Sequence, residues 1–336
     1  MVSVVLDLMG GDHAPHSTIK GVALALRELP EVELYLVGPR SILEKAPQAE
    51  RVKLIESGDE VVTMEDQPHE ALKKKRRASL FVGLDLLAKG EAQAFVSAGN
   101  SGAVVAGSIF ILGRLKGVRR PAIATMLPTL KHPMVLIDAG ANVDSKPYDL
   151  YQFGLMASLF LEKIWQREKP KIALLSIGEE QGKGNQLVKK AHQLFQKSKL
   201  NYVGNVEGRD LYLGEVDVVV CDGFIGNICL KLSEGLAETI MTMLKEEVKK
   251  SFRSVLGMYL AKPALVSFKK KTDWREYGGA PLLGVRGNVI ISHGKSDAVA
   301  IKNAIHQAYK FAKINLWEKL ESAISEYAVE EEASEL

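Results

Sequence analysis

The sequence has little cysteine and no long hydrophobic run. Its two cysteines, Cys221 and Cys229, lie eight residues apart in apolar surroundings, which fits neither a metal-ligand spacing nor a CxxC motif. We therefore expect buried free thiols in a reducing cytoplasm. No stretch of about 20 apolar residues occurs, so no membrane-spanning helix is predicted. The N-terminus has no basic segment, and Asp7 interrupts its apolar run, so no signal peptide is expected.

The sequence also lacks a large excess of positive or of negative charge. The 336 residues carry a formal net charge of +3, which is too small to favour nucleic acid as a partner. No internal repeat and no linker rich in Gly, Pro or Ser is present, so we predict a single catalytic unit over residues 1–336. The charge is unevenly distributed. Residues 73–77 form a basic block, and residues 318–336, with seven Glu and one Lys, form an acidic C-terminal tail.

Short β-rich runs alternate with helical patterns along the chain. The expected strands are Val2–Asp7, Glu33–Val37, Val52–Glu56, Ala94–Ser97, Ala122–Thr125, Met134–Asp138, Lys171–Ile177, Tyr202–Asn205, Val216–Cys221 and Val289–Ser292. The expected helices are Ser17–Leu29, His69–Lys89, Ser101–Leu115, Leu150–Arg167, Gln186–Lys197, Asn227–Lys250 and a last helix from Ile301 to Ile324 with Ser296 as N-cap. This alternation predicts an α/β fold: a three-layer α/β/α sandwich around a mostly parallel sheet.

Information about function lies in the turns that follow the strands. In a parallel sheet such turns emerge at one edge, where α/β enzymes place their ligands. Here they are rich in Gly and Asn, over residues 7–15, 97–103, 138–144, 178–185, 205–210 and 222–227. Glycines let the backbone approach a ligand, and helix N-termini offer N–H groups to anions. Neither the dinucleotide fingerprint nor a Walker loop is matched. The set predicts a cradle for phosphate or an acyl oxyanion.

Several residues of these turns admit two interpretations. His13 either binds substrate or acts as an acid or base, or it caps the helix that follows. Lys183, between two glycines and away from any apolar stripe, is expected to neutralise charge. Cys221 ends a Val run, which favours a small core residue over an acyl-carrying nucleophile. Strand-end carboxylates cap turns more often than they bind a divalent metal, and we expect no metal here; these carboxylates are Asp7, Asp138 and Asp222.

Five motifs together resemble the PlsX family of bacterial phosphate acyltransferases. They are Asp7-Leu8-Met9-Gly10-Gly11-Asp12-His13-Ala14-Pro15, Ser97-Ala98-Gly99-Asn100-Ser101-Gly102, Asp138-Ala139-Gly140-Ala141-Asn142-Val143-Asp144, Asp222-Gly223-Phe224-Ile225-Gly226-Asn227 and Tyr277-Gly278-Gly279-Ala280. The match is collinear from Val2 to about Ala312. Leu8 stands where the family usually has Ala, and Ser101 where Thr is common, but neither change removes a donor that the turn needs.

The resemblance implies a reaction, a fold and an assembly. The family transfers a long-chain acyl group from acyl carrier protein to inorganic phosphate and releases acyl phosphate for phospholipid synthesis. No cofactor and no protein nucleophile is needed, because phosphate itself attacks the thioester. The implied fold is that of the isocitrate and isopropylmalate dehydrogenases, and the implied assembly is a homodimer.

The positions of individual residues in these turns, taken with this reaction, suggest their roles. Lys183 and Asn227 are the expected catalytic residues. The expected substrate-binding residues are Gly10, Gly11, Asp12, His13, Asn100, Ser101, Gly102, Asn142 and Asp222. Acyl carrier proteins are acidic, so the block Lys73–Arg77 is the expected docking surface, with a solvated helix face as the alternative.

A helical arm is expected within the catalytic unit, over residues 240–285. Its segment FRSVLGMYLAKPALVSFKKK, residues 252–271, has helically spaced apolar residues, a break at Pro263 and three terminal lysines. It either packs in a dimer interface or rests on anionic lipid, and the resemblance favours lipid. The enzyme would then be cytoplasmic and peripherally bound to the inner face of the cell membrane. The expected membrane contacts are Leu256, Tyr259, Leu260, Leu265, Val266 and Phe268.

Two other functions fit the same pattern of elements. One is a metal- and NAD-dependent decarboxylating dehydrogenase of the same fold, which would need converging carboxylates. The other is a non-catalytic membrane scaffold that binds acyl carrier protein without turnover.

Overall fold

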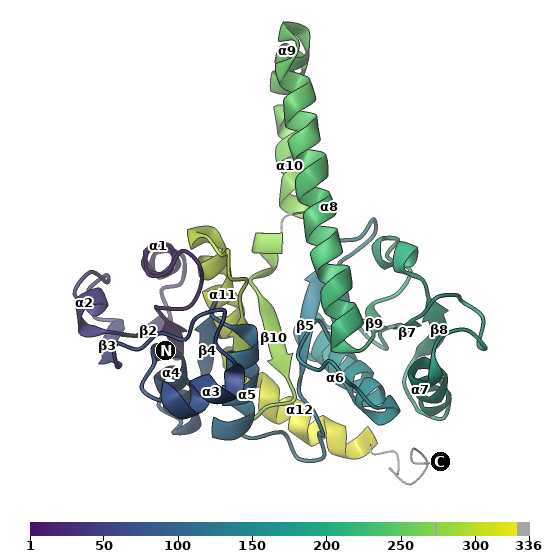
Figure 1. The fold of residues 1–336 in the computed structure, drawn as a ribbon, viewed down its shortest axis with the longest axis horizontal. Helices are drawn as coiled ribbons and strands as arrows, with labels where there is room; N and C mark the ends of the chain where they lie inside the picture. The colour runs from purple at the N-terminus through teal and green to yellow at the C-terminus, as the bar shows by residue number, and fades with distance from the viewer. Residues whose placement is uncertain (273, 328–336) are drawn as a thin grey trace.

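The computed structural model describes residues 1–272 and 274–327 (Figure 1). Its strands are β1 (Val2–Asp7), β2 (Val32–Gly38), β3 (Val52–Glu56), β4 (Ala94–Ser97), β5 (Ala122–Leu127), β6 (Met134–Ile137), β7 (Ile172–Leu175), β8 (Tyr202–Val206), β9 (Val218–Val220), β10 (Ala280–Leu283) and β11 (Asn288–Ile291). All ten expected strands are present, with shifts of a few residues at their ends. Strand β10 was missed, because four residues containing Pro281 carry too weak a pattern.

Within the described residues the strands form one 11-stranded sheet, in the order β3-β2-β1-β4-β11-β10-β5-β6-β9-β7-β8. Seven of its ten pairings are parallel. Helices cover both faces, so the predicted three-layer sandwich with a mostly parallel sheet is confirmed.

The two halves of this sheet run in opposite directions. Strands β1 to β4 and β11 are mutually parallel, as are β6 to β9, but three antiparallel pairings separate the two sets. The expectation that all the Gly- and Asn-rich turns share one edge is therefore wrong. A buried strand has the same apolar sequence pattern whether it runs parallel or antiparallel to its neighbours. The alternation of strands and helices therefore could not predict this reversal.

Register nevertheless brings the two groups of turns toward each other. Ile291 at the end of β11 pairs with Ala280 of β10, and only two residues further along β10 Leu282 pairs with Ile123 of β5. The N–H of Ile123 donates to Asp138, which directly follows β6. The carboxyl ends of both halves thus lie at nearly the same level in the middle of the sheet.

The helices are α1 (His16–Glu28), α2 (Arg40–Leu43), α3 (Pro68–Lys74), α4 (Ser79–Ala88), α5 (Ser101–Ile111), α6 (Pro147–Trp165), α7 (Gln186–Gln196), α8 (Gly223–Lys249), α9 (Phe252–Leu260), α10 (Lys262–Thr272), α11 (Ala298–Ile314) and α12 (Leu316–Ile324). One face of the sheet packs against α1, α6, α7, α11 and α12. The other face packs against α3, α4 and α5.

Two expected helices are each interrupted. Residues 69–89 divide into α3 and α4, and residues 301–324 divide into α11 and α12 at Asn315, whose φ of 52° is left-handed. Asn tolerates that conformation better than most residues. The apolar stripe on both sides of the break is buried as predicted. Its periodicity continues across the break and so gives no sign that the helix is interrupted. The N-cap of α11 is Asp297, whose carboxylate accepts from Val299 and Ala300, and not Ser296.

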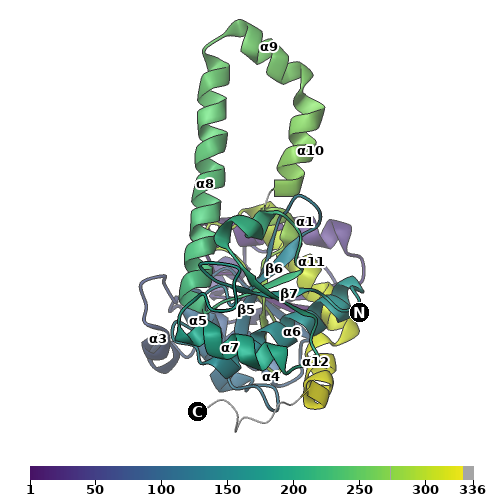
Figure 2. The ribbon, with the colours of Figure 1, turned by 90° about the vertical axis from the view of Figure 1, so that its right-hand side faces the viewer.

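Helices α8, α9 and α10 form an arm that projects from the body (Figure 1). Figure 2 shows α8 and α10 held apart, with α9 bridging them at the tip. Pro263 is the second residue of α10, where its missing N–H breaks no helical hydrogen bond. Arg275 fixes the returning end of the arm to Asp297 at 2.7 Å. Among the described helices none is both long enough and apolar enough to cross a membrane.

The expected acidic tail is described only in part. Residues 316–324 form α12, on which Leu320 and Ile324 are buried. Residues 328–336 lie outside the described residues.

Candidate active site

The turns after β1 and β4 are packed tightly together. The buried carboxylate of Asp7 accepts hydrogen bonds from the hydroxyls of Ser79 at 2.5 Å and Ser97 at 2.7 Å. Burial raises the pKa of Asp7 above its ordinary value, although these donors oppose the shift. A Cβ on Gly10 would lie 2.7 Å from both Asp7 Oδ2 and Gly99 N, so only glycine fits. Asp7 therefore organises the turn.

Asn100 is engaged within the chain at both ends of its amide. Its Oδ1 accepts from the Ala103 N–H at 3.0 Å and so caps α5. Its Nδ2 donates to the carbonyls of Thr63 at 3.1 Å and Asp66 at 3.0 Å, which ties that loop to the helix. Ser101 and Gly102, in the first turn of α5, are exposed.

The turn after β1 also joins the turn after β11. The Asp12 N–H donates to the carbonyl of Gly294 at 2.8 Å, while the side chains of Asp12 and His13 are exposed. Gly11 has a φ of 107°, and a Cβ on it would lie 3.1 Å from the Gly294 carbonyl and 3.2 Å from Ala98 Cβ. The predicted residues Gly10 to His13 and Asn100 to Gly102 thus lie in neighbouring turns on one half of the sheet.

Asp138 organises the turn after β6 in a similar way. Its Oδ1 accepts from the N–H groups of Ile123 and Ala141, at 3.0 and 2.9 Å. Its Oδ2 accepts from the backbone and side-chain N–H groups of Asn142, at 2.7 and 2.8 Å. Burial raises the pKa of Asp138, and these donors oppose the shift. The Asn142 amide also donates to the carbonyl of Pro121 at 2.8 Å, so it too is used within the chain.

Helix α8 begins directly on the Asp138 turn. Asp222 is its N-cap and accepts from the Ile225 N–H at 3.1 Å. Gly226 lies against the carbonyl of Asp138, where no Cβ could fit. The same turn of helix places the exposed side chain of Asn227 beside Gly140, whose Cβ, if present, would lie 3.4 Å from that of Asn227.

Lys183 lies in the turn after β7. Its N–H donates to the Glu180 carbonyl at 2.9 Å, and a Cβ on Gly178 would lie 2.8 Å from Lys183 Cγ, so the lysine stem rests on that glycine. Its side chain is exposed and forms no ion pair within the described part of the chain. Because β7 and β9 are parallel neighbours, the turns of Lys183 and Asn227 leave the same edge of the sheet.

Helix α8 connects the two groups of turns. The Lys231 ammonium lies 2.8 Å from Nε2 of His293, which follows β11, and 2.8 Å from the Glu234 carboxylate. Burial would raise the pKa of Glu234, but hydrogen bonds from His293 and Lys231 outweigh it and hold the pKa below its ordinary value. Sequence reasoning missed this trio, because 62 residues separate Lys231 from His293 and no local pattern marks either one.

The cysteines are free thiols. Cys221 is buried, and burial raises the pKa of its thiol well above the ordinary value. Cys229 is only half-buried, so the expectation of two buried thiols holds for Cys221 alone. Over residues 1–272 and 274–327, no three His, Cys, Asp or Glu side chains are grouped to hold a metal ion.

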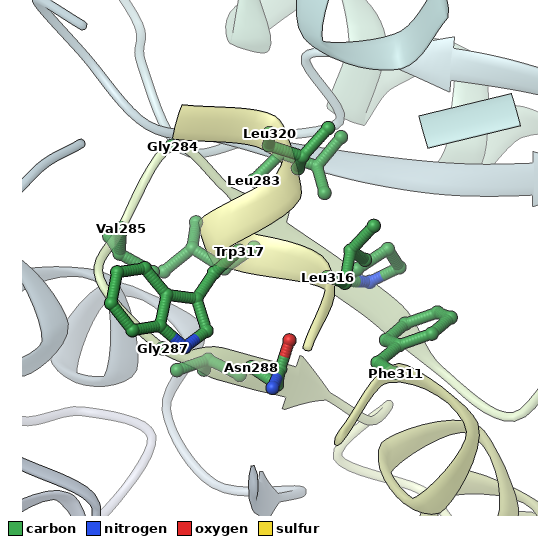
Figure 3. A pocket seen from close by; sticks show the side chains of 12 residues that line it. Leu283, Gly284, Val285, Gly287, Asn288, Phe311, Leu316, Trp317 and Leu320 are labelled. Atoms are coloured by element: carbon green, nitrogen blue, oxygen red, sulfur yellow. The ribbon is translucent and has the colours of Figure 1, made fainter. Parts of the chain in front are cut away.

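A small apolar pocket lies between the β10–β11 hairpin and helices α11 and α12 (Figure 3). Phe311, Leu316, Trp317 and Leu320 line it, and its cavity volume is about 10 Å³. Such a volume holds about one water molecule. The pocket also lies at the opposite end of β11 from His293, so it is no candidate for a substrate site.

Comparison with known proteins agrees with this architecture. Residues 2–319 match the family described as "Fatty acid synthesis protein". The phosphate acyltransferase of Syntrophotalea carbinolica is 49% identical over 311 residues, covering 91% of this chain and 89% of the relative.

Two solved structures share the fold. A phosphotransacetylase from Streptococcus pyogenes matches with a TM-score of 0.61 and 17% identity, over 93% of this chain and 94% of its own. The 4-hydroxythreonine-4-phosphate dehydrogenase from Klebsiella pneumoniae matches with a TM-score of 0.54 and 15% identity, over 93% of this chain and 99% of its own. The resemblance read from the five motifs is confirmed: this chain belongs to the fatty acid synthesis protein family, and it is an acyltransferase.

Proposed function

We propose that this enzyme transfers a long-chain acyl group from acyl carrier protein to inorganic phosphate and releases acyl phosphate. One observation carries the proposal: the exposed polar groups of Lys183 and Asn227 leave the same sheet edge, where they can serve a nucleophile that comes with the substrate. Neither thiol of this region is activated, because burial raises the pKa of both Cys221 and Cys229. The name of the Syntrophotalea relative supports phosphate as acceptor.

The proposed chemistry needs charge stabilisation and positioning. A phosphate oxygen bonds to the thioester carbonyl carbon, and the carbon–sulfur bond breaks when the tetrahedral intermediate collapses. Lys183 and the Asn227 amide donate to the oxyanion that develops on the carbonyl oxygen. The thiolate leaves readily, because its conjugate thiol has a pKa of about 8.5, and it takes its proton from solvent. Among the predicted substrate-binding residues, the exposed His13, Ser101 and Gly102 would hold the phosphate dianion close to the carbonyl.

Apolar side chains around these two residues support an acyl substrate. Ile177, at the start of the Lys183 turn, is 83% exposed, and Phe224, three residues before Asn227 on α8, is 55% exposed. Ile228 follows Asn227 and is also exposed. A single exposed apolar side chain is common on a protein surface, whereas a cluster of them indicates a binding site. We propose that the first methylene groups of the acyl chain lie here.

The proposed docking surface for the acyl carrier, Lys73–Arg77, is partly neutralised by the chain itself. Arg76 forms two hydrogen bonds to Asp85, at 2.8 and 2.7 Å. Lys75 pairs with Asp66 at 2.5 Å and Lys74 with Glu70 at 2.6 Å. Lys73 and Arg77 remain as the cations through which this block would attract an acidic carrier.

The arm offers two apolar surfaces, for which we propose two roles. Near the tip, Leu256, Tyr259, Leu260, Val266 and Phe268 are exposed and Leu265 is half-buried. This surface would rest peripherally on the cytoplasmic face of the membrane. On α8, helically spaced Leu232, Leu236, Ile240 and Met243 are exposed as well, and this stripe would pack in a homodimer.

Purified enzyme mixed with palmitoyl acyl carrier protein and inorganic phosphate tests the reaction. Acyl phosphate and free carrier thiol should appear together, and both should require phosphate, with sulfate as the control anion. Carrier binding without turnover would instead favour the scaffold. Turnover that requires NAD and a divalent metal would favour the dehydrogenase.

A further inference from the structure

A buried amide fixes the turn that carries Lys183. The carbonyl of Glu180 accepts the Lys183 N–H at 2.9 Å and also Nδ2 of Asn205 at 3.2 Å. Asn205 lies on β8, next to β7, and is 7% exposed. A buried side-chain donor on a carbonyl of an otherwise exposed turn restricts the positions that the turn can take.

A β-bulge directs Asn205 toward this turn. The register between β7 and β8 shifts after Ile172, so that Ile172 pairs with Tyr202 while Ala173 pairs with Gly204. Val203 is the extra residue, and Gly204 has a φ of 108°. Tyr202 and Asn205, three residues apart, would face opposite sides of a regular strand. The bulge instead brings the Tyr202 hydroxyl within 3.4 Å of the side-chain amide oxygen Oδ1 of Asn205. Bulges often redirect a side chain beside an active site.

The other side of Asn205 is held by the helix that follows the turn. The Tyr202 hydroxyl lies 2.6 Å from Nδ1 of His192 on α7. The Tyr202 ring stacks on Phe195 of the same helix, with centroids 5.0 Å apart. Burial lowers the pKa of His192 and raises the pKa of Tyr202, so both groups favour their neutral forms. This neutral, packed pair gives Asn205 a rigid support.

We infer that Asn205 is a positioning residue: by holding the Glu180 carbonyl, it fixes the turn that presents Lys183 to the reacting thioester. The inference rests on the proposed function, in which Lys183 stabilises the oxyanion. Because Asn205 touches no substrate in this scheme, it acts only through Lys183.

A double-mutant cycle tests this coupling. Asn205→Leu should lower kcat about tenfold, the loss expected when one positioning hydrogen bond is removed. In the Lys183→Ala background the same change should have less than about a twofold effect, because the group it positions is gone. Residual turnover in that background is measured at high enzyme concentration. An equal loss in both backgrounds would overturn the inference, since a merely structural role is independent of Lys183.

The matched control is Asn201→Leu. Asn201 lies just before β8 and donates in the same way to a backbone carbonyl, that of Lys169 at 2.7 Å, but at the other end of the strand. Its kcat should stay within about twofold of wild type. If Asn205→Leu does not fold, Asn205→Asp, which keeps the shape and removes the donor, carries the same expectation.

Two failures are distinguishable. If the Lys183→Ala variant has normal turnover, Lys183 does not stabilise the oxyanion, and the inference about Asn205 is overturned as well. If Lys183→Ala is slow but the folded Asn205 variants are as fast as wild type, the proposed function stands and only the inference is overturned.

Discussion

Gly226 in the first turn of α8 lies directly against the backbone carbonyl of Asp138. This contact lets the helix start on the turn after β6 and brings Asn227 beside Gly140. Nothing but hydrogen fits between the two backbones. The position of the proposed catalytic amide of Asn227 therefore depends on the absence of a side chain at the preceding residue, Gly226.

Gly226→Ala should displace the start of α8 and lower both stability and turnover. Overpacking of this kind costs about 1–3 kcal/mol, and more where backbone must move. Gly235→Ala is the matched control, because it lies in the same helix with no atom within 4 Å of its Cβ position. That change should stabilise the protein by up to about 1 kcal/mol through helix propensity. Chemical denaturation of the two variants checks the contrast; equal stabilities would contradict this account.

Lys183→Ala should reduce kcat about a hundredfold or more if the ammonium is a preorganised partner of the oxyanion. The variant should fold normally, since the lysine head is exposed and unpaired in the described chain. Lys189→Ala, a change of an exposed lysine on α7, serves as control and should keep wild-type turnover. Steady-state rates with palmitoyl carrier would reject the assignment if the folded Lys183 variant were nearly as fast as wild type.

Substitution by Asn should destabilise the protein less at Asp7 than at Asp138, because the two carboxylates have different hydrogen-bond partners. Two of the Asp7 partners are hydroxyls, which can accept as well as donate, so Asp7→Asn should cost about 1 kcal/mol or less. Both oxygens of Asp138 accept hydrogen bonds from N–H groups, and an N–H group cannot act as an acceptor. In Asp138→Asn the new side-chain NH2 group would therefore face N–H donors with no acceptor to bind. That variant should lose about 2–3 kcal/mol or more. Similar losses in thermal unfolding would contradict the argument.

The pH dependence follows from the sign of the Asp7 shift. Burial raises the pKa of Asp7 above the unfolded value of 3.8. Its stabilising contribution is therefore complete below that pH and is lost as pH rises through the higher folded pKa. Asn cannot titrate, so Asp7→Asn should gain stability relative to wild type between pH 3.8 and neutrality. Unfolding free energies measured across this range would show no relative change if the folded pKa were unshifted.

The sequence predicts more of the elements than of their arrangement. Runs such as Val216–Cys221 fix strands, and Gly-Asn turns mark their carboxyl ends, so the residues of the candidate site were recognisable. The reversal between the half-sheets was not, because pairing direction depends on contacts between distant strands such as β5 and β6. The Lys231–His293 contact is of the same kind. The break at Asn315 escaped notice because the apolar stripe continues across it.

Lys73→Glu combined with Arg77→Glu should raise the KM for the acyl carrier and weaken its dependence on salt. Exposed charges at an interface act mainly on association rate and screening. The kcat should not change, because the block lies away from the Lys183 turn. Lys189→Glu with Lys190→Glu, on α7, is a control of equal charge. Unchanged KM and salt dependence in the first variant would place the docking surface elsewhere.

The arm provides the last test, because its two apolar surfaces can be altered separately. Leu256→Glu with Leu260→Glu changes the tip, where both side chains are exposed on α9. Burial of such side chains favours insertion by about 25 cal/mol per Å². A nearby lysine such as Lys262 adds about 1 kcal/mol at an anionic surface. Binding should thus be reversible in the wild type, and the tip variant should stop sedimenting with anionic liposomes while it remains a dimer with normal turnover on soluble substrate.

Leu236→Glu with Ile240→Glu changes the α8 stripe instead and should produce monomers in sedimentation velocity, because each protomer would bury two unpaired carboxylates in the dimer interface. The division of roles predicts that each pair of changes disturbs one property and spares the other. If the tip variant becomes monomeric and the α8 variant loses liposome binding, the two surfaces have been assigned the wrong way round. If the tip variant still sediments with liposomes, the tip does not bind lipid, since two carboxylates on its exposed face cannot enter a bilayer without a large cost.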